Sequence, residues 1–189
     1  LLGMVVSTGV GGGLVLDGQL VHGAQGNAGH IGHVIVRPGG PRCACGARGC
    51  LEAIAAGPSL ARAAVRALGR GTASALRGVA PLTGEAVAAA ARAGDPLALT
   101  LLAEAGRAIG QALASAAALL DLDRVVIGGG VSQAGTLLFT PLQAEVAHRA
   151  RLAFTRDLTV VPAQLGRRAG VVGAAALIFQ AADATVVRP

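Results

Sequence analysis

Three cysteines and one histidine within eighteen residues constrain this chain more than any other feature of its sequence. They follow the spacing His-x9-Cys-x-Cys-x4-Cys and include every cysteine of the chain: His33, Cys43, Cys45 and Cys50. Three thiolates and an imidazole form a complete tetrahedral shell for one zinc ion. The alternatives are three unrelated thiols or a disulfide, although three cysteines cannot all pair within one chain. The spacing therefore predicts a closed, structural zinc site.

The composition of the 189 residues excludes several other classes of protein. A hydrophobic content of 53% argues against a disordered chain. No uninterrupted apolar run reaches the roughly 18 residues of a membrane span, and no basic-then-apolar leader is visible. We therefore expect a cytoplasmic protein without a membrane partner.

The net charge of +6 raises the question of nucleic-acid binding. All sixteen basic residues are arginine, they are scattered, and the only aromatic residues besides histidine are three phenylalanines. A binding surface for nucleic acid combines clustered basic side chains with aromatic stacking platforms, so we expect no direct binding. Because lysine is absent, any phosphate must be held by backbone amides, helix N-termini, arginine or a metal.

The order of strand and helix signals predicts one mixed α/β domain over residues 1–189. We expect strands at 2–7, 124–127 and 158–161, a hairpin over 13–22 that turns at Asp17-Gly18, and helices over 51–56, 58–68, 95–120, 132–153 and 170–182, with a further short helix capped by Thr83. Residues 23–50 are rich in glycine and proline, and a bound metal would order them. Because the chain begins inside a predicted strand, we expect an N-terminal lobe before it.

Two glycine-rich segments are candidate phosphate or nucleotide sites. Thr8-Gly-Val-Gly-Gly-Gly13 lies between two predicted strands, where a simple hairpin turn is an equally good interpretation. Gly128-Gly-Gly130 lies between a buried strand and a helix, the place where α/β proteins usually bind ligands. A plain strand-to-helix connection is the alternative there.

Two further side chains near the cysteines are candidate ligand-binding groups. Glu52 follows Cys50 by two residues, so the same loop would hold its carboxylate rigidly; otherwise it is a favourable first-turn carboxylate. His30 precedes His33 by three residues and is either a ligand-facing group or an exposed loop histidine.

Taken together, these motifs resemble the ROK family of bacterial sugar kinases and sugar-responsive repressors. Its second phosphate loop is matched by Ser7–Gly13, and its sugar and zinc signature by Ala28–His33 and Cys43–Glu52. Its adenosine-side motif is similar to Val125–Ser132, and its last helix to Ala169–Ala175. The resemblance covers nearly the whole chain, as the C-terminal part of such a protein.

The resemblance implies an actin-like, ribonuclease-H-like lobe with a mixed sheet, packed helices and a zinc-bound loop. It implies that His30, His33 and Glu52 bind a sugar, and that His33 also ligates structural zinc. Magnesium-bound ATP would contact the nucleotide-side residues, which are Thr8, Gly9, Gly11, Gly12, Gly128, Gly129 and Gly130. A homodimer is also expected from the family.

Two departures from the family pattern affect the expected activity. His30 stands where the family usually has a sugar-binding glutamate, so a preference for glucose does not follow. The aspartate general base and the first phosphate loop of the kinases are expected before Leu1, so we assign no catalytic residue and expect no turnover by this chain alone. We expect a glucokinase-like enzyme for a hexose or N-acetylhexosamine; the alternative is the effector domain of a repressor.

Overall fold

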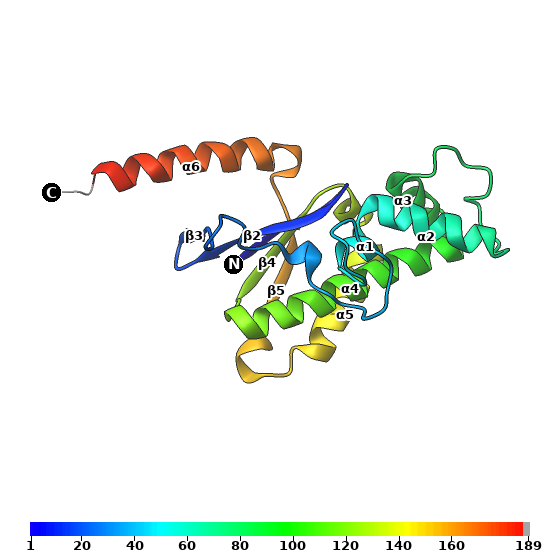
Figure 1. Cartoon of the computed structure of the whole chain (residues 1–189), viewed down its shortest axis with the longest axis horizontal. Helices are drawn as coiled ribbons and strands as arrows, with labels where there is room; N and C mark the ends of the chain where they lie inside the picture. The colour runs from blue at the N-terminus through cyan, green and yellow to red at the C-terminus, as the bar shows by residue number, and fades with distance from the viewer. Residues whose placement is uncertain (187–189) are drawn as a thin grey trace.

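The chain forms a five-stranded mixed sheet with helices packed around it, as the computed structural model shows (Figure 1). The structure describes residues 1–186, without the side chains of Arg167 and of residues 179–186. The strands are β1 (Leu2–Val6), β2 (Val10–Leu16), β3 (Gln19–Val21), β4 (Arg124–Gly128) and β5 (Thr159–Pro162). The helices are α1 (Glu52–Ala55), α2 (Gly57–Gly69), α3 (Gly84–Arg92), α4 (Pro96–Leu120), α5 (Thr136–Arg149) and α6 (Ala169–Val186).

The sheet has the strand order β3-β2-β1-β4-β5, which combines a hairpin with a parallel unit. The strands β1, β2 and β3 pair antiparallel, whereas β4 pairs parallel to both β1 and β5. The Asp17-Gly18 turn joins β2 to β3 with positive φ at both residues, as its sequence predicts. The parallel strands place the end of β4 beside the turn that follows β1, and this edge carries part of the candidate site.

The core joins one face of the sheet to α4 and α5. Burial alternates along β1, where Leu2, Met4 and Val6 are buried and Val5 is exposed. The buried strand residues belong to one hydrophobic cluster with Ile109 and Leu113 of α4 and with residues of α5. By contrast, α6 extends away from the rest of the chain (Figure 1).

Side-chain caps fix the starts of α3 and α4 where the sequence predicts them. The Thr83 side chain accepts a hydrogen bond from the Ala86 N–H, and Asp95 accepts one from the Ala98 N–H. Pro96 occupies the first turn of α4, where its missing N–H has no intrahelical partner to lose. No single helix within residues 1–186 is long and apolar enough to span a membrane; α3 and α4 pass such a test only as a pair bent by 114°.

The structure differs from the sequence-based expectation in two places. The helix predicted over 132–153 is a short 3₁₀ turn, Val131–Ala134, followed by α5 (Thr136–Arg149), because Gly135 between them has a φ of 59°. The second strand starts at Val10 rather than at residue 13, so Gly11 and Gly12 lie inside β2. The turn after β1 is therefore shorter than the glycine run indicates.

Candidate functional site

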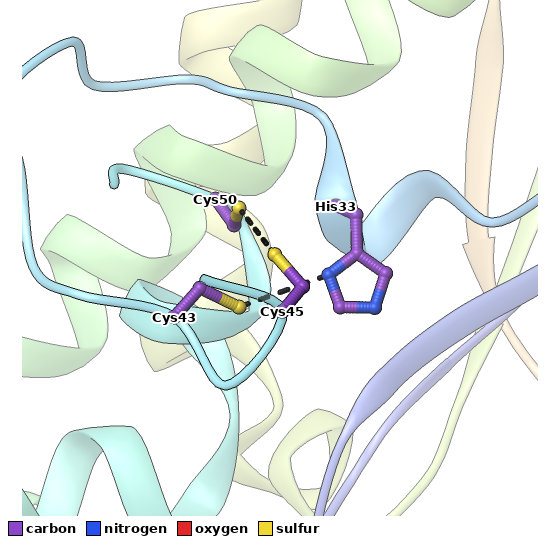
Figure 2. Close-up of side chains that lie close together, drawn as sticks. All are labelled: His33, Cys43, Cys45 and Cys50. Atoms are coloured by element: carbon purple, nitrogen blue, oxygen red, sulfur yellow. Dashed lines mark hydrogen bonds between the residues drawn. The ribbon is translucent and has the colours of Figure 1, made fainter. Parts of the chain in front are cut away.

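The four predicted metal ligands converge in the structure (Figure 2). Their ligand atoms all lie within 4.8 Å of one another, although His33 comes from the 3₁₀ helix η1 (Ile31–His33) and the cysteines from the loop that follows. Cys45 Sγ lies 3.6 Å from Cys50 Sγ, and Cys43 Sγ lies 3.7 Å from His33 Nδ1. In a tetrahedral site with Zn–S bonds of about 2.3 Å, neighbouring sulfurs are about 3.8 Å apart. The cluster therefore fits a zinc ion.

Backbone contacts, rather than regular elements, hold the loop that carries these ligands. Isolated bridges pair Ile35 with Cys50 and Arg42 with Arg48, and the Leu51 N–H donates to the Val34 carbonyl at 2.9 Å. The loop also packs directly on β2, because a Cβ on Gly32 would lie 1.9 Å from the Val10 carbonyl oxygen. Only glycine allows this approach, which fixes the loop against the sheet.

The thiols of the cluster have unequal proton affinities. A backbone hydrogen bond from Ala47 is the main cause that lowers the pKa of the exposed Cys45 thiol. Burial is the main cause that raises the pKa of Cys50 to about 12, with Cys45 and Cys43 adding to the effect. Three adjacent thiolates repel one another unless a cation neutralises them, so this donor set suits a metal that deprotonates its thiols.

His30 and His33 lie with their rings stacked beside the cluster. Their ring centroids are 5.7 Å apart and the ring planes differ by 21°. Nδ1 of His33 faces Cys43, whereas its Nε2 points away from the sulfurs (Figure 2). His33 can thus bind a metal through one nitrogen and a ligand hydroxyl through the other. The exposed His30 lies beside it but outside the metal cluster.

Glu52 connects the cysteine loop to the turn between β1 and β2. It begins α1, two residues after Cys50, and its Oε2 accepts a hydrogen bond from the Val10 N–H at 2.9 Å. The same Oε2 would lie 2.8 Å from a Cβ on Gly9, so a larger residue there would displace the carboxylate. The Val10 N–H therefore holds the carboxylate beside the turn, and a sugar-binding role for Glu52 stays a prediction.

A cavity of about 440 Å³ is lined in part by the first residues of this turn. Its wall comes from four separate stretches: Ser7 and Thr8 after β1, the start of α2, the start of α3, and Gly130 and Val131 after β4. The glycine-rich motifs predict Thr8 and Gly130 as nucleotide-side residues, and the structure brings these two together in the cavity wall. The cavity is also lined by residues that no motif predicts, because they come from different stretches of the chain: Pro58, Arg62, Leu82 and Glu85.

The other predicted nucleotide-side glycines have different surroundings. Gly11 is open to solvent space, whereas a Cβ on Gly12 would lie 2.8 Å from the Gly3 carbonyl oxygen, so packing within the sheet explains that glycine. Gly129 has a φ of 100° and packs on Val6, and Gly128 lies next to Ala163. Among these glycines, only Gly130 lines the cavity. A nucleotide role for the others stays a prediction.

Hydrogen bonds connect the metal cluster side to the cavity. The hydroxyl of the buried Ser59 donates to the Glu52 carbonyl at 2.8 Å and accepts from Arg62 Nη2 at 2.8 Å. Arg62 lines the cavity, while Glu52 lies two residues from Cys50. The site therefore combines a metal-binding loop with a cavity of the size that binds small molecules.

Known proteins are similar to this chain over nearly its whole length. A glucokinase from Thermotoga maritima is 36% identical over 182 residues, which cover 94% of this chain and 57% of the enzyme. An N-acetylglucosamine repressor from Escherichia coli is 35% identical over 179 residues, covering 93% of this chain and 43% of the repressor. The chain thus spans about half the length of the curated relatives that it matches.

Solved structures confirm the expected actin-like arrangement of sheet and helices. A ROK family glucokinase from Streptomyces griseus, in complex with glucose and AMPPNP, superposes with a TM-score of 0.79 at 36% identity. This match covers 93% of the present chain and 59% of the glucokinase. The family model described as "ROK family" matches residues 1–181, and on this match the chain belongs to the ROK family.

Proposed function

We propose that this chain forms the sugar- and nucleotide-binding part of an ATP-dependent kinase for a hexose or N-acetylhexosamine. One observation carries the proposal: Thr8 of the β1–β2 turn lines a cavity together with Gly130, while Val10 at the end of the same turn donates to the Glu52 carboxylate. A kinase must bring a nucleotide phosphate and a sugar hydroxyl together, and this turn contacts both the cavity and the Glu52 carboxylate.

The proposed sugar site consists of His30, Nε2 of His33 and the Glu52 carboxylate. A zinc ion held by His33, Cys43, Cys45 and Cys50 is structural in this proposal, because four protein ligands leave no open position for substrate. The zinc orients the imidazole of His33, since Nδ1 bound to the metal leaves Nε2 to face a sugar hydroxyl.

The proposed nucleotide site is the cavity of about 440 Å³. Thr8 and Gly9 lie at the phosphate end in this proposal, with Gly11 on the adjoining open strand surface, and Gly130 lies near the nucleoside. Magnesium would accompany ATP, because its charge neutralises the phosphates while the protein positions them.

Four of the described aspartates belong to a helix cap, to turns or to an ion pair. Asp95 caps α4, Asp17 and Asp121 adopt positive φ in turns, and Asp123 pairs with the amino group of Leu1. None of the aspartate side chains that the structure describes lines the cavity. We therefore propose that phosphoryl transfer requires an aspartate supplied from outside this chain.

The alternative function is the sugar-binding effector part of a transcriptional repressor. The similarity to the N-acetylglucosamine repressor favours it, since that protein is nearly as similar as the glucokinase. The two functions differ in nucleotide binding, which the kinase requires. A homodimer, expected from the family, fits both proposals, and light scattering in solution tests it.

Calorimetric titration of the purified chain tests the proposed function. We expect glucose, N-acetylglucosamine or N-acetylmannosamine to bind, and magnesium-bound ATP to bind as well. Sugar binding without any nucleotide binding would favour the repressor interpretation. Binding of neither ligand by a folded, zinc-loaded chain would contradict both.

A further inference from the structure

Glu85, which no motif singled out, presents a carboxylate to the cavity. It lies in the first turn of α3 and lines the cavity opposite the glycine loop that follows β4. Its Oε1 lies 4.0 Å from the position that a Cβ on Gly130 would occupy, and Ser7 Oγ lies 3.6 Å from the same position. The carboxylate and the β1–β2 turn therefore approach Gly130 from two sides.

The carboxylate of Glu85 is ionised at neutral pH. Its own backbone N–H, followed by the Thr83 hydroxyl, lowers the pKa of this carboxyl below its ordinary value. The Thr83 oxygen accepts from the Ala86 N–H at 3.2 Å, so the hydroxyl hydrogen remains available for Glu85. An ionised carboxylate only accepts hydrogen bonds and repels a phosphate. The part of a nucleotide that faces Glu85 must therefore be a hydrogen-bond donor rather than a phosphate.

The remaining wall near Glu85 is mostly apolar. Pro58 and Ala61 of α2, Leu82 before α3 and Val131 after Gly130 face the same cavity. Such a wall suits the flat face of a nucleobase, and Ser7 and Thr8 add hydroxyl groups to the lining. A ribose lies between a base and its phosphates, and its hydroxyl groups are uncharged donors that suit the Glu85 carboxylate beside Gly130.

We propose that Glu85 accepts hydrogen bonds from the 2′- and 3′-hydroxyls of the bound nucleotide and so selects ribonucleotides over deoxyribonucleotides. The two oxygens of a carboxylate match the two donors of a vicinal diol, and acidic residues of dinucleotide-binding folds bind a ribose hydroxyl in the same way. This assignment rests on the proposed function, because it needs a nucleotide in this cavity.

Titrations with three nucleotides test the assignment. ATP, 2′-deoxy-ATP and 3′-deoxy-ATP are titrated into the chain and into Glu85→Gln, each with and without magnesium. We expect the wild type to bind ATP about tenfold more tightly than either deoxynucleotide, because each deoxy analogue lacks one charge-assisted hydrogen bond. Glu85→Gln should bind all three with similar affinity, close to that of the wild type for the deoxynucleotides.

A matched control and a stability check accompany this comparison. Glu145→Gln removes a carboxylate from α5, where its partner is Arg149, and should leave the preference for ATP unchanged. Thermal unfolding followed by circular dichroism checks that Glu85→Gln is folded. The wild-type preference for ATP over the deoxynucleotides tests the assignment even without the variant.

Three results would overturn the assignment in distinguishable ways. Equal binding of the three nucleotides by the wild type would show that Glu85 does not bind the ribose, while the proposed function stands. An equal loss for all three in Glu85→Gln, seen only with magnesium, would make Glu85 a metal ligand instead. Binding of no nucleotide by the wild type would contradict the proposed nucleotide site itself.

Discussion

The two halves of the site are built in opposite ways. The metal-cluster half, residues 29–52, is a loop with little regular structure, and its chemistry lies in side chains that are close in sequence. The cavity half is formed by the residues that follow β1 and β4 and by the starts of α2 and α3, which are far apart in sequence. A ligand cluster can order a loop that has no core of its own, whereas the cavity depends on how the helices and strands pack.

This difference means that damage to one half should leave the other largely intact. The two halves meet chiefly at Glu52, whose carboxylate accepts from the Val10 N–H and whose carbonyl accepts from the Ser59 hydroxyl. Metal content and protease resistance report on the loop, and nucleotide affinity reports on the cavity. The following substitutions test the comparison from the largest expected effect to the smallest.

Gly32→Ala should have the largest effect. The added Cβ would lie 1.9 Å from the Val10 carbonyl oxygen, so the loop must move away from β2. We expect a loss of about 3 kcal/mol or more in the free energy of unfolding, measured by denaturant titration, together with cleavage of the loop by proteases. Gly13→Ala is the control, since nothing lies within 4 Å of its Cβ position. Wild-type stability of Gly32→Ala would refute the close packing.

His33→Gln should remove most of the zinc affinity, by about 100-fold or more, because it deletes one of four ligands. His30→Gln is the matched comparison: its ring stacks on His33 but lies outside the cluster, so zinc binding should persist while sugar binding weakens. Zinc titration with a chromogenic chelator measures the first effect, and calorimetry the second. Equal zinc loss in both variants would make His30 a ligand.

Gly84→Ala should damage the cavity half alone. A Cβ on Gly84 would lie 2.6 Å from the Cα of Gly57, so the starts of α2 and α3 must separate. We expect about tenfold weaker ATP binding with unchanged zinc content, because a displaced wall no longer fits the nucleotide. Gly69→Ala, in open space at the end of α2, should change neither property. Loss of zinc in Gly84→Ala would show that the halves are not independent.

Asp95→Ala should change stability but neither half of the site. The buried carboxylate accepts hydrogen bonds from the N–H groups of Ala98 and Ala75, which are the main causes of its lowered pKa, and from the Ser74 hydroxyl. Its contribution is therefore complete above the unfolded pKa of 3.8 and is lost as the pH falls through the lower folded value. Asp95→Ala should lower Tm at neutral pH by several degrees and flatten the acid dependence.

Thermal unfolding from neutral pH down to below pH 3.8 measures this effect. A wild-type slope in the variant would mean that other carboxylates control acid unfolding. Zinc content and ATP affinity at neutral pH should match those of the wild type.

The sequence predicts those features that nearby residues determine. The caps at Thr83 and Asp95, the Asp17-Gly18 turn and the convergence of the metal ligands follow from local spacing. The start of α5 could not be predicted, because the helical pattern of the sequence runs through Gly135. The positive φ of this glycine interrupts the helix there. Similarly, a run of glycines does not show which of them a strand includes.

The cavity half is where sequence-based prediction fails. From the sequence, Glu85 is an ordinary carboxylate in the first turn of a helix. Leu82 is a loop residue, and Pro58 marks the start of a helix. Their common role depends on tertiary packing, which brings α2 and α3 together at Gly57 and Gly84. No periodicity or spacing in the sequence predicts the contact between these two glycines.

The zinc content of the purified chain, measured with the reactivity of its thiols, tests most directly the claim that a metal orders the loop half. The account predicts about one zinc per chain, and three thiols that react only after chelation, when the loop also becomes sensitive to proteases. A chain without metal, with three freely reactive thiols and a protease-resistant loop, would contradict it.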